Sequence, residues 1–146
     1  MSTLLVRRAL PGDLEKVMEL LTMESLPTLG VAEHFLNFHV AEMGNEIVGA
    51  IGLEIYPDGT ALLRSAVVIP GHRNAGIGSS LCQENMKLAR DRGIHRLLLL
   101  TNTAEPYFAR KGFAKIDQSS VTGPVRSSVE FSGACPSHAA CMELML

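Results

Sequence analysis

The hydrophobic pattern of this 146-residue chain changes its period after Pro70, and that change constrains the fold more than any other feature. Before it, the runs Phe38–Met43, Glu46–Tyr56 and Thr60–Ile69 have the length and the turn punctuation of strands. After it, the apolar residues of Gly76–Arg92 recur at helical spacing. We therefore expect an antiparallel three-strand meander that leads directly into a helix.

The remaining segments extend this order. The expected elements are a first strand at Thr3–Arg8, an amphipathic helix with Asp13 as its N-cap and Leu14, Val17, Met18 and Leu21 on its apolar face, a buried strand at Ile94–Thr101, a short helix at Ala104–Lys111, a strand at Phe113–Asp117, and a final edge strand from Val129–Phe131 and Ala140–Leu144. This order predicts an α/β (α+β) fold built on a mixed sheet.

Length and charge exclude several kinds of partner. The chain fits a single domain over residues 1–146, and its formal net charge of −2 gives no field that would attract nucleic acid or an anionic membrane. The N-terminus lacks the basic and apolar regions of a signal peptide, and the run Leu97–Leu100 is too short to span a bilayer. The odd number of cysteines (Cys82, Cys135, Cys141) is typical of reduced thiols, so we expect a cytoplasmic protein.

The segment Arg73-Asn74-Ala75-Gly76-Ile77-Gly78 stands between the last strand of the meander and the helix. Its two glycines let the backbone approach a ligand closely, and a helix that begins there has unpaired amides that favour an anion such as a pyrophosphate. The segment lacks the Gly-Lys-Ser/Thr ending of a nucleotide-hydrolase P-loop, and it does not open a dinucleotide-binding βαβ unit. A simple cap or packing role for the glycines is the alternative interpretation.

Two blocks of the sequence resemble the GNAT acetyltransferase superfamily. Val68–Gly78 looks like its acetyl-CoA motif, a Val-x-Pro followed by Arg/Gln-x-x-Gly-x-Gly/Ala, and Asn102–Phe113 looks like its later motif, an Asn followed ten residues on by Gly-Phe. The separation of the blocks and the element order match as well. The resemblance implies the GNAT fold, with a mixed, mostly antiparallel sheet flanked by helices on both faces. It also implies an N-acetyltransferase that uses acetyl-CoA as cosubstrate.

Three stretches are most similar to the small acetyltransferases of arsenic-resistance operons: Gly52–Tyr56, Leu62–Ser65, and Glu130–Pro136 with Cys141-Met142. They also resemble the acetyltransferase domain of N-acetylglutamate synthases. This narrower resemblance implies a small-molecule amine acceptor with an amino-acid-like structure.

The superfamily resemblance also implies which residues contact the cofactor. The backbone of Ala66–Val68 would pair with the pantetheine arm as an extra strand, and the loop amides would hold the pyrophosphate. Asn102 matches the CoA-side asparagine of the family, with a helix N-cap as the alternative. The candidate cofactor-binding residues are Ala66, Val67, Val68, Arg73, Asn74, Ala75, Gly76, Ile77, Gly78, Ser79 and Asn102.

An acceptor amine must be neutral to attack a thioester, so the site needs a general base. Glu54 is the candidate, because in an alternating strand it shares a face with Gly52 and Tyr56. A hairpin turn after Tyr56 also places it opposite Leu62 and diagonal to Arg64, within reach of an ion pair. Catalysis and simple pairing both stay open.

Arg64 interrupts an aliphatic strand, and its planar fork suits a substrate carboxylate or similar oxyanion. An edge position with the charge in solvent is the alternative. Ser65 and Tyr56 complete the candidate substrate-binding residues. GNAT enzymes often have a tyrosine, the acid for the CoA thiolate, where this chain has Phe108, and Tyr107 comes one residue earlier. Tyr107 is either that acid or a packing residue, in which case water protonates the thiolate.

Two other functions are consistent with the sequence. The first is a GNAT-fold module that binds acetyl-CoA and regulates a partner without turnover. The second is a thiol protein that binds a metalloid through Cys135 and Cys141, with His138 between them, although this spacing matches no well-known zinc pattern. No metal site is predicted. A homodimer is compatible with the resemblance, since dimers are common in the superfamily.

Overall fold

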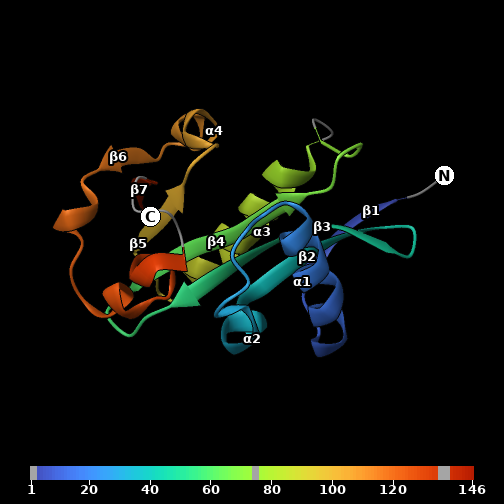
Figure 1. Ribbon diagram of the computed structural model, residues 1–146, viewed down its shortest axis with the longest axis horizontal. Helices are drawn as coiled ribbons and strands as arrows, with labels where there is room; N and C mark the ends of the chain where they lie inside the picture. Colours follow the sequence, from blue (N-terminus) through green and yellow to red (C-terminus); the bar gives the residue numbers. More distant parts are fainter. Residues whose placement is uncertain (1–2, 74–75, 135–138) are drawn as a thin grey trace.

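The computed structural model describes residues 3–73, 76–134 and 139–146, and within them seven strands form one sheet in the order β1-β2-β3-β4-β5-β7-β6 (Figure 1). The strands are β1 (Leu4–Arg8), β2 (Phe38–Met43), β3 (Glu46–Ile55), β4 (Thr60–Val68), β5 (Arg96–Thr101), β6 (Ala114–Ile116) and β7 (Ala140–Met145). The α-helices are α1 (Leu14–Met23), α2 (Val31–His34), α3 (Ile77–Asp91) and α4 (Glu105–Arg110). The predicted fold class is confirmed.

Helices cover both faces of the sheet. α1 and α2 lie on one face and α3 lies on the other (Figure 1). Helical spacing predicted which side chains of these helices are buried: Leu81 and Leu88 of α3 and Val17 and Leu21 of α1 all lie in the core. Two separate apolar clusters result, one under α1 and α2 and one under α3.

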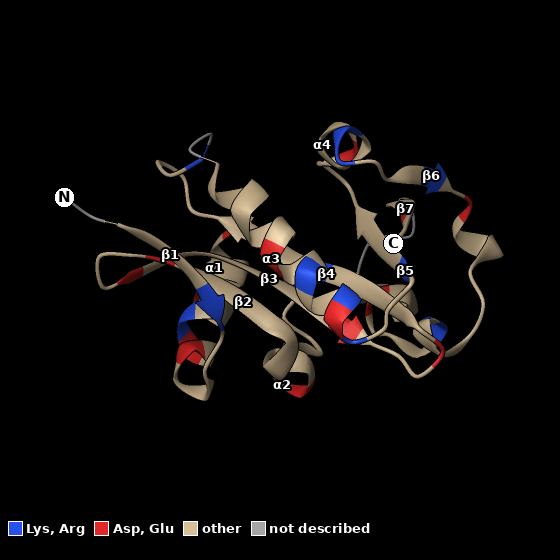
Figure 2. Cartoon of the chain, turned by 180° about the vertical axis from the view of Figure 1, so that it is seen from behind, with Lys and Arg blue, Asp and Glu red and all other residues tan. Residues whose placement is uncertain are grey.

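The outer face of α3 carries charges of both signs (Figure 2). Its exposed residues include Glu84, Lys87, Arg90 and Asp91. This mixture agrees with the weak net charge of the sequence. None of the described helices has the length and apolar character needed to cross a membrane.

The prediction for the last strand is wrong in two respects. β7 is not an edge strand but lies between β5 and β6, where Cys141 and Met142 are buried. The edge is the three-residue β6, whose short length and exposed Lys115 suit that position. Val129–Phe131 forms no strand, because the Ser128 hydroxyl accepts a hydrogen bond from the backbone N–H of Glu130 and the segment continues as a π-helical turn.

The sheet opens between β4 and β5. The two strands run parallel but pair only over Thr60–Leu62 and Arg96–Leu98. Further along β4, Ser65 and Ala66 together oppose the single residue Ile51 of β3, which is a β-bulge. Ser65 has a φ of 60°, a left-handed conformation that is rare outside glycine. Bulges bend the strand that carries them, so β4 turns away from β5 and the two strands diverge (Figure 1).

Candidate active site

A pocket of about 250 Å³ occupies the opening between β4 and β5. β4 contributes Arg64–Val68 and β5 contributes Leu99–Thr101, while α3 adds Gly78 and α4 adds Tyr107. Arg64 and Val68 are four positions apart on β4, and four residues of an extended strand span about 13 Å. The pocket therefore has two separate ends: one lies at α3 and α4, and the other lies around Arg64.

At the first end, the start of α3 has no side-chain cap. Gly76 precedes the helix with a φ of 79°, and no atom of the described residues lies within 4 Å of the position that a Cβ would take there. The first amides of the helix are thus left for a ligand, as the sequence suggested. Asn74 and Ala75 of the predicted loop lie outside the described residues. Arg73 donates from Nε to the Val68 carbonyl oxygen at 3.0 Å and forms an ion pair with Glu24.

The hydroxyl of Tyr107 is buried in the pocket and finds no hydrogen-bond partner among the described residues. It lies 3.7 Å from the position of a Cβ on Gly78. Burial raises the pKa of this hydroxyl, so it is protonated at neutral pH. Phe108, by contrast, is buried edge-on against Phe113. A buried donor without a partner is costly, so a ligand that offers an acceptor here fits the pocket.

Val67 and Val68 pair with β3 on one side, and on the other side of β4 no described strand pairs with it beyond Leu62. This edge is available to an extended ligand. Ser79 is half-buried, and its hydroxyl accepts a hydrogen bond from Lys111. Asn102 is exposed and does not line the pocket. The backbone N–H of Ala104, at the start of α4, donates instead to Thr101 Oγ1 at 3.0 Å.

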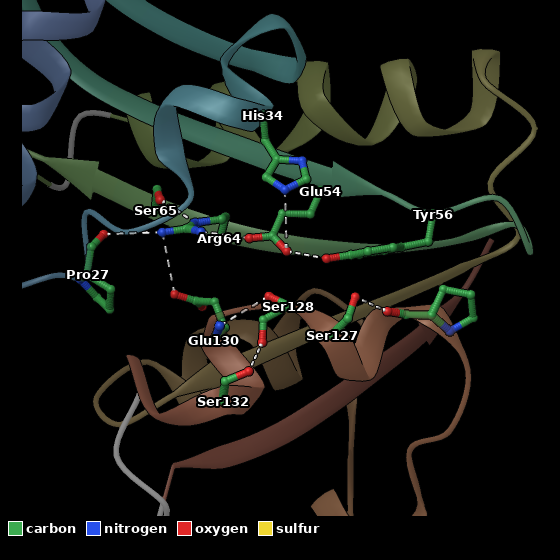
Figure 3. Close-up of polar contacts among 11 residues, drawn as sticks. Pro27, His34, Glu54, Tyr56, Arg64, Ser65, Ser127, Ser128, Glu130 and Ser132 are labelled. Atoms are coloured by element: carbon green, nitrogen blue, oxygen red, sulfur yellow. Dashed lines mark hydrogen bonds and ion pairs between the residues drawn. The ribbon is translucent and has the colours of Figure 1, made fainter.

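At the second end, the guanidinium of Arg64 is completely buried and held by four protein groups (Figure 3). It donates from Nη1 to Glu54 Oε2 at 2.7 Å, from Nη2 to the Pro27 carbonyl at 3.3 Å, and from Nε to Ser65 Oγ at 3.0 Å. Glu130 Oε2 lies 3.7 Å from Nη2. The ion pair with Glu54 is the one that the strand register predicted, and the alternative of an edge position in solvent is wrong because β4 is central in the sheet.

Glu54 is 1% exposed and pairs with Leu62 in register, as predicted. Tyr56 donates its hydroxyl to Glu54 Oε1 at 2.5 Å, and His34 Nε2 lies 4.0 Å from the same oxygen (Figure 3). Burial raises the pKa of the Glu54 carboxyl, but hydrogen bonds from Ser128, Tyr56 and the Arg64 guanidinium outweigh it and hold the pKa below its usual value. Burial and the neighbouring carboxylate raise the pKa of Tyr56. Glu54 is therefore ionised at neutral pH.

Four residues of this cluster were missed from the sequence: Pro27, His34, Ser128 and Glu130. Each comes from a loop or a short helix, where no periodicity indicates which way a side chain points. Gly30 lies beside this cluster, and its role is visible in the structure. It has a φ of 82°, and a Cβ there would lie 2.8 Å from Nη1 of the buried arginine, so a side chain would displace the guanidinium.

The cysteines do not form a metal centre among the described residues. Cys82 packs in the core under α3, as predicted. Burial raises the pKa of the Cys141 thiol to about 11, so it is protonated at neutral pH. Cys135 and His138 lie outside the described residues.

Comparison with known proteins identifies the family. A sequence profile of the acetyltransferase (GNAT) family matches residues 8–113. The chain belongs to the GNAT family. An amino-acid acetyltransferase of Mycobacterium tuberculosis is 30% identical over 131 residues, which cover 82% of this chain and 74% of that protein. An uncharacterized N-acetyltransferase of Chlorobaculum tepidum is 25% identical over 116 residues, 80% of this chain and 72% of the relative.

Solved structures show the same GNAT fold. The N-acetylglutamate synthase of Neisseria gonorrhoeae, crystallised with coenzyme A and N-acetyl-glutamate, superimposes with a TM-score of 0.84 at 19% identity, over all of this chain but only 36% of the synthase. A Mycobacterium tuberculosis protein crystallised with CoA and NLQ superimposes with a TM-score of 0.79 at 24% identity. The match covers 97% of this GNAT chain and 99% of the Mycobacterium tuberculosis chain. As a GNAT member the chain is an acyltransferase, and acetyl-CoA is its cosubstrate.

Proposed function

We propose that this chain moves an acetyl group from acetyl-CoA to the amine of a small, amino-acid-like acceptor by direct attack. The observation that carries the proposal is the pocket between β4 and β5, with an unpaired donor at one end and a buried charged cluster at the other. The named relatives add support, because one is an amino-acid acetyltransferase and one structure holds N-acetyl-glutamate.

Acetyl-CoA supplies the acetyl group as a thioester. We assign its pyrophosphate to the amides around Gly76 and Gly78, and its extended arm to the open edge of Ala66–Val68. Arg73, Ile77 and Ser79 flank the same turn, and Asn74, Ala75 and Asn102 remain candidates by resemblance alone.

The acceptor nitrogen forms a bond to the acetyl carbon, the carbon–sulfur bond breaks, and the thiolate takes a proton. We assign proton removal from the amine to Glu54, which is ionised; it does not itself line the pocket but lies 2.7 Å from the guanidinium of Arg64, which does. We assign thiolate protonation to Tyr107, which lines the pocket and whose protonated hydroxyl is buried near Gly78. Arg64 and Ser65 line the pocket where the acceptor would lie.

The experiment that tests this function follows CoA thiol release with a panel of amines. The panel contains free amino acids and arsenic- or phosphorus-containing amino-acid analogues, because of the resemblance to arsenic-resistance acetyltransferases. We expect turnover with at least one member. Binding of acetyl-CoA without turnover, unchanged in Glu54→Gln, would favour the regulatory module, for which the full hydrogen-bonding of Glu54 is the supporting observation.

A substitution at Gly76 tests where the cofactor binds. Gly76→Asp places a carboxylate and a strained left-handed residue against the assigned pyrophosphate position, so we expect the Kd for acetyl-CoA to rise at least about 100-fold, or about 2.7 kcal/mol. Isothermal titration calorimetry measures this Kd. Gly93→Asp is the matched control: it lies at the other end of α3 with a φ of 76°, and in the part of the chain that the structure describes no atom lies near its Cβ position. Equal affinity of wild type and Gly76→Asp would contradict the assignment.

A further inference from the structure

A second cavity, of about 420 Å³, lies where the end of α4 meets α3. Five of the residues that line it come from α3 and one directly follows α4: Ser79, Cys82, Gln83, Met86, Arg90 and Lys111. Cys82 also lines the pocket between β4 and β5, so the two spaces share a wall. The described lining residues include two bases and no acid. A cavity with this charge favours an anionic ligand.

The ammonium group of Lys111 links this cavity to the start of α3. It donates a hydrogen bond to Ser79 Oγ and lies 5.5 Å from the centroid of the Tyr107 ring. Ser79 directly follows Gly78, whose amide is among those assigned to the pyrophosphate. An ammonium has three hydrogens to donate, and within the described part of the chain Ser79 is its one hydrogen-bond acceptor. Two N–H groups of Lys111 are therefore available to a ligand beside the start of α3.

The charge of Lys111 has no carboxylate partner among the described residues. The nearby Lys115, by contrast, lies 3.7 Å from Glu105 Oε1 in an ion pair. Lys111 is also half-buried, so its ammonium has lost part of its hydration without gaining a counter-ion. An anion that enters the cavity would supply the missing partner.

Resting on the cofactor placement in the proposed function, we infer that Lys111 binds the ribose 3′-phosphate of CoA. In CoA the pyrophosphate and the 3′-phosphate are carried by the same ribose, so a pyrophosphate held at Gly76 and Gly78 puts the 3′-phosphate close to Ser79 and Lys111. A lysine binds phosphate as a compact point charge. Arg90 lies about 16 Å further along α3 than Ser79, so it adds to the positive field without sharing this contact.

The test compares the Kd values of CoA and dephospho-CoA, which lacks only the 3′-phosphate, by isothermal titration calorimetry. We expect wild type to bind CoA at least about tenfold more tightly, because hydrogen bonds between charged groups are the strong ones. Lys111→Met raises the Kd of CoA about tenfold and changes the Kd of dephospho-CoA by no more than about twofold, so most of the preference disappears. Lys111→Arg keeps the charge and the preference.

Lys87→Met is the matched control, since it removes the same charge from an exposed position of α3 that lines neither pocket, and its ratio of Kd values stays at the wild-type value. Melting curves establish that each variant is folded, and the wild-type ratio tests the inference even where Lys111→Met is unstable. Equal affinity of wild type for the two ligands, or an equal loss of affinity for both in Lys111→Met, overturns the inference.

The two proposals fail in different ways. A wild-type preference for CoA that Lys111→Met removes, together with absence of turnover for every amine, contradicts the proposed acetyl transfer and leaves the inference standing. A wild type that binds neither CoA nor dephospho-CoA overturns both.

Discussion

Arg64 is stable inside the sheet because every part of its guanidinium has a partner. A buried cation without partners is very costly, and here two carboxylates, a carbonyl and a hydroxyl compensate for lost hydration. The close approach of Gly30 keeps the guanidinium in place from the side. The cluster is thus a structural unit as well as a part of the candidate site.

The Glu54–Arg64 pair makes stability depend on pH in a defined direction. The pKa of Glu54 is lower in the folded protein than in the unfolded chain, so its contribution is present at neutral pH and is lost as pH falls below about 4.3. We expect Glu54→Gln to lose about 3 kcal/mol of unfolding free energy at pH 7. The difference from wild type shrinks as pH falls through the folded pKa, because protonated Glu54 resembles glutamine.

Urea unfolding of both proteins at pH 7 and near pH 3.5 measures this difference. Glu46→Gln, an exposed change, serves as the reference and shows no such pH dependence. A difference that stays constant over this range would mean that the pair does not stabilise the fold through the Glu54 charge.

The sequence predicted part of the site because strand alternation and hairpin register are local rules. They put Glu54 opposite Leu62 and near Arg64, and the loop spacing drew attention to Gly76. The approach of the Glu130 carboxylate to Arg64 could not be predicted in the same way. It depends on a turn built from Ser128, more than sixty positions from Arg64 in the chain, and no periodicity connects the two.

At the scale of elements, amphipathic periodicity predicted nearly all the strands and helices within one or two residues. The exceptions have physical causes. A bulge such as the one at Ser65 depends on which strand lies alongside and leaves no mark in hydropathy. The place of β7 between β5 and β6 is a matter of topology, and aliphatic alternation gives no information about the order of strands.

Packing between β2 and β3 depends on the absence of a side chain at Gly52. A Cβ there would lie 2.1 Å from Cε1 of the buried Phe38 ring, so Gly52→Ala forces the ring or the strand to move. We expect a loss of about 1–3 kcal/mol in unfolding free energy. Chemical denaturation measures it, with Gly12→Ala as the control, since none of the described residues has an atom within 4 Å of that Cβ position. Equal stability of Gly52→Ala and wild type would show that the ring yields without cost.

At the scale of the molecule, the sheet consists of two parts joined by a narrow seam. β1–β4 form one part and β5, β7 and β6 the other, and the pairing of β4 with β5 covers only three residue pairs. A ligand that binds in the opening contacts both parts. Binding is therefore expected to stabilise the whole fold rather than one loop.

This expectation has a thermal consequence. CoA at about 100 times its Kd adds about 2.7 kcal/mol to the unfolding free energy, which raises Tm by about 8 °C for a chain of this size. Differential scanning fluorimetry measures the shift, and hydrogen exchange places the gain in protection on β4 and β5. In Gly76→Asp, whose Kd is expected to be about 100-fold higher, the same CoA concentration adds at most about 0.4 kcal/mol and raises Tm by no more than about 1 °C. Protection confined to α3 would show that the ligand does not bridge the seam.

The bulge at Ser65 and Ala66 also means that β4 cannot be shortened by one residue there without changing how it pairs. Removing either residue would restore the alternation of the strand, and the amides that now face the opening would find carbonyls on β5. After such a deletion β4 and β5 would pair over more of their length. The sheet would gain hydrogen bonds and lose the opening in which a thioester could bind. The one extra residue of the bulge thus prevents β4 and β5 from pairing along their whole length.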